Sequence, residues 1–174
     1  MPAMPVRKNM PSTDTPDATD TAAAAAATGD AAPAALASVL GYQLAQAAVA
    51  ANALFMRQVG GVLDLRPVEY TILARVHETP GLSSARLAQM LSVSAPNITV
   101  WIDRLVGRGW VLREPSETDR RERLLRATAD GARLATQATE RLIDGERKAF
   151  SHLSAAERAI LIELLHRLAR TAEG

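Results

Sequence analysis

The chain has 174 residues, enough for about one domain with a hydrophobic core. Its formal net charge is +1, so bulk charge indicates no particular partner, and the absence of cysteine excludes disulfides and thiolate metal sites. Three scattered histidines suggest no metal site, and no apolar run approaches the ~18 residues of a membrane span. We therefore expect a soluble, cytoplasmic protein with no cofactor, no metal and no membrane partner.

Arginine dominates the basic residues, with 18 arginines among the 20 Lys and Arg residues. Its planar fork of donors suits phosphates and guanine edges, although the same bias equally reflects genome composition. Residues 1–32 consist mainly of Pro, Thr, Asp and Ala, with almost no large apolar side chain. Such a segment cannot bury enough surface to offset the entropy of ordering, so we predict a disordered tail followed by one domain over 33–174.

Two helices are predicted after this tail. Apolar residues recur at three- and four-residue spacing through 33–59, with Pro33 in the first turn and Gly60–Gly61 as the stop. A second helix begins near Pro67, and the sequence "ETPGL" at 78–82 ends it. Its apolar face is formed by Val68, Ile72, Leu73 and Val76.

The stretch 83–110, "SSARLAQMLSVSAPNITVWIDRLVGRGW", predicts two short helices joined by a tight turn. Ser83 or Ser84 can cap the first helix. Ser94 can cap the second, which has Pro96 in its first turn. Small polar residues near the start of the second helix complete the pattern of a helix-turn-helix. The expected buried faces are Leu87, Ala88 and Leu91 on the first helix and Ile98, Ile102 and Leu105 on the second.

A β-hairpin is predicted next, because "WVLRE" (110–114) and "ERLLRAT" (122–128) have strand character and "PSETDRR" (115–121) is rich in turn residues. A hairpin directly after a helix-turn-helix is a wing. Two helices follow, one over about 129–151 and one that begins at the Ser-x-x-Glu capping box of 154–157. The fold class expected is mainly α with a small β-hairpin (α+β). The last helix has a broad apolar stripe of Ile160, Leu161, Leu164, Leu165 and Leu168.

Residues 34–170 resemble the multiple-antibiotic-resistance-regulator (MarR) family, most specifically in "IDRLVGRGWVLR" (102–113) and "DRRERLLRATADG" (119–131). The resemblance implies a winged helix-turn-helix over about 62–128 and dimerisation helices over about 33–59 and 129–171. It also implies a homodimeric regulator, most often a repressor, on double-stranded DNA with a palindromic operator. An isologous interface would account for the apolar last helix. The expected interface residues are Leu36, Leu40, Leu44, Ile160, Leu164, Leu165 and Leu168.

The recognition helix departs from the family at Val100, where a basic residue is frequent. Base readout is therefore expected nearer the helix start, where Asn97 can read adenine and a Val or Thr methyl can meet a thymine methyl. Arg104 either contacts phosphate or pairs with an acid such as Asp103, and the resemblance makes Asp119 of the wing a structural partner of an arginine. Arg120 at the tip is the candidate for the minor groove. The full set of expected DNA contacts is Ser83, Ser94, Pro96, Asn97, Thr99, Val100, Arg104, Arg108, Arg113, Arg120, Arg121 and Arg123.

The resemblance also implies a small effector, often an aromatic acid or phenol, bound between the dimerisation helices and the DNA-binding lobe. The candidate residues are Phe55, Arg57, Tyr70 and His77, of which an arginine suits a carboxylate. No nucleophile–base pair, metal-ligand spacing or phosphate-binding glycine loop is present in the sequence, so we do not expect an enzyme. The alternative left open is a winged-helix protein–protein interaction module without sequence-specific DNA binding.

Overall fold

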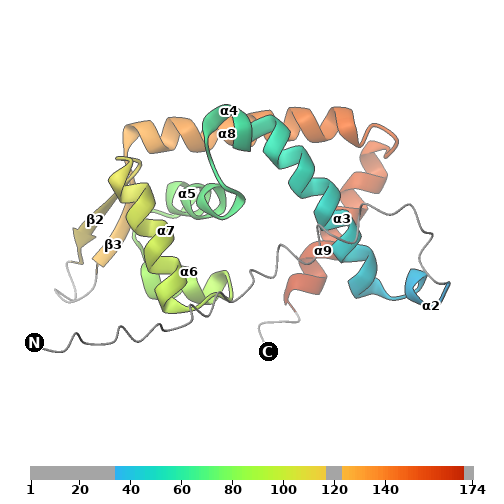
Figure 1. The fold of residues 1–174 in the computed structure, drawn as a ribbon, viewed down its shortest axis with the longest axis horizontal. Helices are drawn as coiled ribbons and strands as arrows, with labels where there is room; N and C mark the ends of the chain where they lie inside the picture. Colours follow the sequence, from blue (N-terminus) through green and yellow to red (C-terminus); the bar gives the residue numbers. More distant parts are fainter. Residues whose placement is uncertain (1–33, 117–122, 171–174) are drawn as a thin grey trace, which may run out of the picture. The chain divides into compact units, whose positions relative to one another are not determined.

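The computed structural model describes residues 34–116 and 123–170, which are mostly helical with a small antiparallel sheet (Figure 1). The chain divides into two compact units after Ala51. Within the described ranges, no helix is both long enough and apolar enough to cross a membrane. The predicted tail over 1–32 and the wing-tip residues Asp119, Arg120 and Arg121 lie outside the described residues.

The first unit contains α2 (Ala34–Ala37) and most of α3 (Leu40–Phe55). The sequence predicted one continuous helix here, and that prediction is wrong at residues 38 and 39, which form a turn. Two hydrogen bonds stabilise this turn. Val39 N donates to Leu36 O at 3.0 Å, and the Ser38 hydroxyl donates to Ala35 O at 3.0 Å.

The predicted helix stop at Gly60–Gly61 is also wrong. After α3 the chain continues through a π-helical turn, η2 (Met56–Gly60), and a short helix, α4 (Gly61–Leu63). The stop comes at Asp64, whose φ of 51° lies in the left-handed region. A Cβ at position 60 would lie 2.7 Å from the sulfur of Met56, whose flexible side chain is half exposed and can shift.

The π turn packs against the long helix α8 (Ala129–Ala149). A π turn shifts the backbone hydrogen-bond pattern of the helix and changes which carbonyls lack a helical partner. The carbonyl of Gln58 accepts a hydrogen bond from Arg141 Nε at 2.7 Å. Gly145 lies against the same residue, because a Cβ at 145 would fall 2.6 Å from the Gln58 side chain.

The predicted helix-turn-helix is confirmed. It consists of α6 (Ser84–Met90) and α7 (Ala95–Gly107), and it follows α5 (Pro67–Glu78). The turn after α6 uses Ser92 at φ 52°, and Val93 N donates to Ala88 O at 3.0 Å, which closes the end of α6. The predicted buried faces of the two helices are also confirmed, with Leu91 half-buried and the others buried.

The wing is confirmed as an antiparallel pair, β2 (Val111–Pro115) and β3 (Arg123–Ala127). A third strand, β1 (Leu82–Ser83), pairs with the other edge of β3, so the sheet order is β1-β3-β2. The sequence did not predict β1, because two residues are too few for a period-2 pattern. Leu125 is the central residue of the sheet: it stands opposite both Leu82 and Arg113 and is fully buried.

Helix α8 runs along α5, and α9 (Ala155–Arg170) leads away from the end of α8 (Figure 1). The predicted capping box of α9 is confirmed, because Ser154 N donates to Glu157 Oε2 at 2.8 Å and Glu157 N donates to Ser154 Oγ at 3.2 Å. Hydrogen bonds from the hydroxyl and the backbone N–H of Ser154 lower the pKa of the Glu157 carboxyl.

The second unit has two hydrophobic clusters that share partly buried residues, Trp110 and Leu134. The larger cluster packs the helix-turn-helix against α5 and the sheet. Burial of each fully buried Leu or Ile in this cluster stabilises the folded state by about 1.5–3 kcal/mol. The smaller one lies between the end of α3, η2 and α8. The fully buried large aliphatic residues of the two clusters are Val59, Leu65, Ile72, Leu73, Val76, Leu87, Ile98, Ile102, Leu105, Val111 and Leu125.

The start of α8 meets the backbone of Trp110 without room for a side chain, because a Cβ at Gly131 would lie 2.0 Å from Trp110 O. We expect Gly131→Ala to reduce the free energy of unfolding by about 3 kcal/mol, since the backbone of one element must move. Urea denaturation measures this. The matched control is Gly107→Ala, where no atom lies within 4 Å and stability should be unchanged or raised by up to about 1 kcal/mol. Equal stability of the two variants would contradict the prediction.

Candidate nucleic-acid interface

One face of α7 is exposed along the whole helix. The apolar stripe of α7 is buried against α5 and α6, which leaves the opposite side exposed. Val100 lies in the middle of this side with 57% of its surface exposed, although it is a large apolar residue. The exposed residues of this face that the sequence predicted as DNA contacts are Ser94, Pro96, Asn97, Thr99, Val100 and Arg104.

The start of α7 differs in one respect from the prediction. Ser94 occupies the N-cap position with extended backbone, but its side chain makes no capping hydrogen bond. Thr99, one turn further along, donates its hydroxyl hydrogen to Ala95 O at 2.8 Å. The Thr99 hydroxyl oxygen can therefore still accept a hydrogen bond, while its proton is held by the helix.

Arg104 of α7 pairs with Glu69 of α5, with Arg104 Nε 3.0 Å from Glu69 Oε1. The pair is unequal: 41% of the Arg104 side chain is exposed, against 1% for Glu69. The other carboxylate oxygen of Glu69 accepts a hydrogen bond from Arg66 N at 3.0 Å, which satisfies one free N–H at the start of α5. Oε1 has no aligned hydrogen bond among the described residues, so the Arg104 charge is what compensates it.

Arg108, at the end of α7, is held by Asp64 and Trp110. Its Nη1 donates to the Asp64 carbonyl at 2.7 Å, its Nη2 donates to Asp64 Oδ2 at 2.8 Å, and its guanidinium lies 3.9 Å from the centre of the Trp110 ring. Both terminal nitrogens are thus directed at Asp64. This arrangement joins the end of α7 to the left-handed residue that ends α4.

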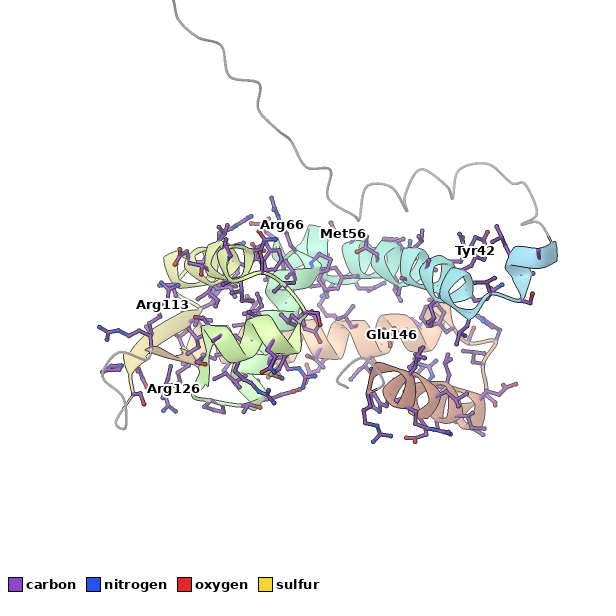
Figure 2. The ribbon with its side chains drawn as sticks, turned by 90° about the horizontal axis from the view of Figure 1, so that it is seen from below. Tyr42, Met56, Arg66, Arg113, Arg126 and Glu146 are labelled. Carbon is purple, nitrogen blue, oxygen red and sulfur yellow. The ribbon has the colours of Figure 1, made fainter. Side chains whose placement is uncertain are left out.

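The wing strands carry further arginines (Figure 2). Arg113 of β2 pairs with Asp103 of α7, Nη2 to Oδ1 at 2.6 Å, and so ties the wing to the exposed face of α7. Arg126 of β3 pairs across the strands with Glu114 at 2.8 Å. Arg123, the first residue of β3, is exposed beside the segment that the structure does not describe.

Ser83 has a structural role that the sequence also allowed. It is half-buried, it belongs to β1, and its hydroxyl accepts a hydrogen bond from Arg86 N at 3.3 Å as the cap of α6. Sequence reasoning missed Glu69, although a signal was present. Glu69 falls at helical spacing with Ile72, Leu73 and Val76, so a carboxylate stands within an apolar stripe.

The predicted effector residues fall into separate groups. Phe55 is buried and its ring lies 5.7 Å from that of Tyr70, whose hydroxyl is 3.0 Å from Thr139 Oγ1. His77 is exposed and lines a hollow of about 220 Å³ between α5 and α8, to which Thr139 also contributes. Arg57 is exposed on η2 and is not among the residues that line this hollow. The lining residues are Ala74, His77, Glu78, Ala135, Thr136, Thr139 and Glu140.

The residues predicted for a dimer interface are largely uncovered in the single chain. Helix α9 has no buried residue at all. In the first unit, Leu36 and Leu40 are exposed and Leu44 is half-buried. The large apolar residues exposed on α9 are Ile160, Leu161, Ile162, Leu164, Leu165 and Leu168, with exposed fractions of 37–59%.

Within residues 34–116 and 123–170, no group of three or more His, Cys, Asp or Glu side chains could hold a metal ion. The sequence comparisons point instead to a family of regulators. The family model described as "MarR family" matches residues 65–122. A putative transcriptional regulatory protein for the hcr operon of Thauera aromatica is 31% identical over 135 residues, which covers 78% of this chain and 81% of that protein.

The multiple antibiotic resistance protein MarR of Salmonella typhimurium is 30% identical over 107 residues, which is 61% of this chain and 74% of that protein. Among solved structures, the transcriptional repressor CouR bound to a 23-mer DNA duplex superposes with a TM-score of 0.73 at 27% identity, covering 80% of this chain and 99% of the other. These relatives are regulators, not enzymes. The winged helix-turn-helix, the family match and the identities agree, and this chain belongs to the MarR family of transcriptional regulators.

Proposed function

We propose that this protein is a homodimeric repressor that binds a palindromic operator and is released from it by a small effector. The observation that carries the proposal is the exposed face of α7, on which short polar and apolar side chains are flanked by the arginines of α7 and the wing. The similarity to a repressor whose solved structure is bound to a DNA duplex supports the same use of this face.

The roles of the side chains follow from their chemistry. Asn97 can bond to both N6 and N7 of adenine, and the exposed methyls of Val100 can pack on a thymine methyl. Arg104, Arg113 and Arg123 would contact phosphates and fix the register. Arg120 and Arg121, which lie outside the described residues, remain the proposed wing contacts with the DNA, and Asp119 the proposed partner that orients an arginine.

In the alternative, a protein–protein interaction module, the exposed face of α7 would bind another protein chain instead of DNA. The exposed face of α7 suits DNA better, because its side chains match base edges and its flanking arginines match phosphates. Access to DNA implies a cytoplasmic location, which is part of the same proposal.

Interface charges of this kind predict binding that depends strongly on salt. With ~6–10 phosphate contacts per dimer, the affinity for an operator should fall about 10³–10⁵-fold between ~50 and ~200 mM salt. The probe is a duplex recovered by selection of the protein on a random-sequence library, measured by mobility shift against a shuffled duplex of equal composition. If no duplex is enriched at low salt, sequence-specific DNA binding is refuted.

The uncovered face of α9 supports the dimer. A helix of 16 residues that buries no residue in its own chain is marginal in water, because helices of this length depend on packing for stability. A second copy of the chain would cover the same patch on both subunits, as twofold symmetry requires.

We expect Leu164→Asp to convert the dimer to a monomer, since a charge would be buried at the centre of the apolar face. Light scattering after size-exclusion chromatography gives the mass, and the mobility shift should be lost in parallel. The matched control is Glu163→Gln on the same helix, which introduces no new charge and should remain dimeric. A Leu164→Asp variant that is still dimeric would contradict the assignment of α9 to the interface.

For the effector we propose a small aromatic acid that enters the hollow beside His77. The hollow is connected to the aromatic pair Phe55 and Tyr70, because the Tyr70 hydroxyl contacts Thr139 of its lining. Among the lining residues only His77 can carry a positive charge, whereas Glu78 and Glu140 are acids, so His77 is the proposed partner of the carboxylate, and Arg57 outside the lining is the alternative.

The effector proposal is tested by a thermal-shift screen, in which the stabilisation by each aromatic acid is compared with that by its uncharged amide. At about 100 times its dissociation constant, an acid that binds the folded state adds about 2.7 kcal/mol of stability. It should also reduce the mobility shift and restore transcription in vitro from a template that carries the selected duplex and is repressed by the protein. His77→Ala should abolish the response. If it does not and Arg57→Ala does, the cation is Arg57, and no response to any acid refutes the ligand class.

A further inference from the structure

Glu69 is a buried carboxylate in a helix face that is otherwise apolar. It is fully buried at the crossing of α5 and α7, among the residues of the larger hydrophobic cluster. One of its oxygens accepts the Arg66 N–H, and the other faces Arg104 Nε at 3.0 Å. Among the ion pairs of the described residues, this is the pair whose acid is removed from water.

Stability alone does not account for a buried carboxylate at this position. Well-packed apolar residues of similar volume are often as stabilising as a buried ion pair, because both charges must lose their hydration. What an ion pair adds is a fixed geometry. Here the ion pair fixes the position of the Arg104 guanidinium. Arg104 lies on the exposed side of α7, and 41% of its side chain is exposed.

The way in which Arg104 is held distinguishes it from its neighbours. Glu69 contacts Nε, and within the described residues Arg104 has no other ion pair or hydrogen bond, so both Nη groups remain for another partner. Arg108 in contrast directs both Nη groups at Asp64, and Arg113 directs Nη2 at Asp103. Two free Nη groups match two oxygens of one phosphate or the two acceptors of a guanine edge.

We propose that Glu69 is a positioning residue for DNA recognition, which fixes the guanidinium of Arg104 from the protein interior so that its two Nη groups meet the DNA. The inference rests on the proposed function of α7. Positioning by Glu69 and simple charge compensation predict opposite effects of removing the Glu69 charge on the affinity for DNA. If Glu69 only neutralised Arg104, its removal would add positive charge and strengthen DNA binding, whereas loss of positioning weakens it.

The test is a double-mutant cycle of Glu69→Gln, Arg104→Ala and the double variant in the dimeric full-length protein, with binding to the selected duplex and to its shuffled counterpart measured over a range of salt. We expect Glu69→Gln to weaken binding to the selected duplex about tenfold or more, as for the loss of one well-placed arginine contact with the DNA. We expect Arg104→Ala to reduce the salt slope by about 1. The double variant should bind no worse than Arg104→Ala. Additive losses, or equal or tighter binding by Glu69→Gln, would overturn the inference.

The control is Asp64→Asn, which also removes one negative charge and loosens an arginine, Arg108, but whose carboxylate is 94% exposed. Its binding to the selected duplex should stay the same or increase. An equal loss in this variant would show that releasing any arginine harms binding, and would overturn the special role of Glu69.

Thermal unfolding of each variant accompanies the cycle. If Glu69→Gln does not fold, Arg104→Lys carries the test, because an ammonium can pair with Glu69 or with a phosphate but lacks the fork that does both. Binding of this variant to the selected duplex should fall, with the shuffled duplex little affected, and unchanged affinity would overturn the inference. Failure of the wild-type protein to enrich any duplex would instead refute the proposed function itself.

Discussion

The first turn of α8 lies directly on the peptide group of Trp110, because residue 131 is a glycine and leaves no side chain between them. Thr128 closes this joint: its N–H donates to Trp110 O at 3.0 Å, and its hydroxyl donates to Gly109 O at 2.8 Å while accepting from Gly131 N. Since Trp110 contacts both hydrophobic clusters, the joint sets the position of the wing, the end of α7 and α8 together. Arg108 and Arg113 of the proposed interface lie on these elements.

The ion pairs of individual arginines, rather than the net charge of the chain, determine the charge at the proposed interface. The chain as a whole carries only +1, yet Arg104, Arg108 and Arg113 each pair with an acid. The acids reduce the local positive potential and in return limit the rotamers of long side chains, which cost entropy when they are ordered on binding. Such an arrangement favours selective contacts over general attraction to phosphate.

Sequence periodicity predicted what depends on local pattern. The stripe of Ile98, Ile102 and Leu105 and the hairpin after it were confirmed, because an apolar face must be buried and a turn-rich segment between two strands closes a hairpin. The stop at Gly60–Gly61 was wrong, because the chain continues through η2 and α4 to Asp64, and no local pattern reveals the left-handed backbone of that residue. The assignments of DNA-contacting and effector residues stay predictions.

Ion pairs between residues distant in sequence could not be predicted, because they too depend on tertiary packing. Arg104 was assigned either to phosphate or to an acid, and the acid turned out to be 35 positions away on α5. Glu69 at helical spacing with apolar residues was a visible signal, because a carboxylate in a buried stripe requires a charged partner. The identity of that partner depends on how α5 and α7 cross, and the crossing follows from packing.

Helix α9 extends this dependence on packing beyond the single chain. Its capping box satisfies the first turn, but a cap of this kind adds only about 1 kcal/mol, which does not offset the ordering of a 16-residue helix in which no residue is fully buried. If the proposed dimer covers α9, its helical order and the association of subunits are the same equilibrium. Stability then increases with protein concentration, and DNA binding, which needs two copies of α7 at fixed spacing, is linked to the same step.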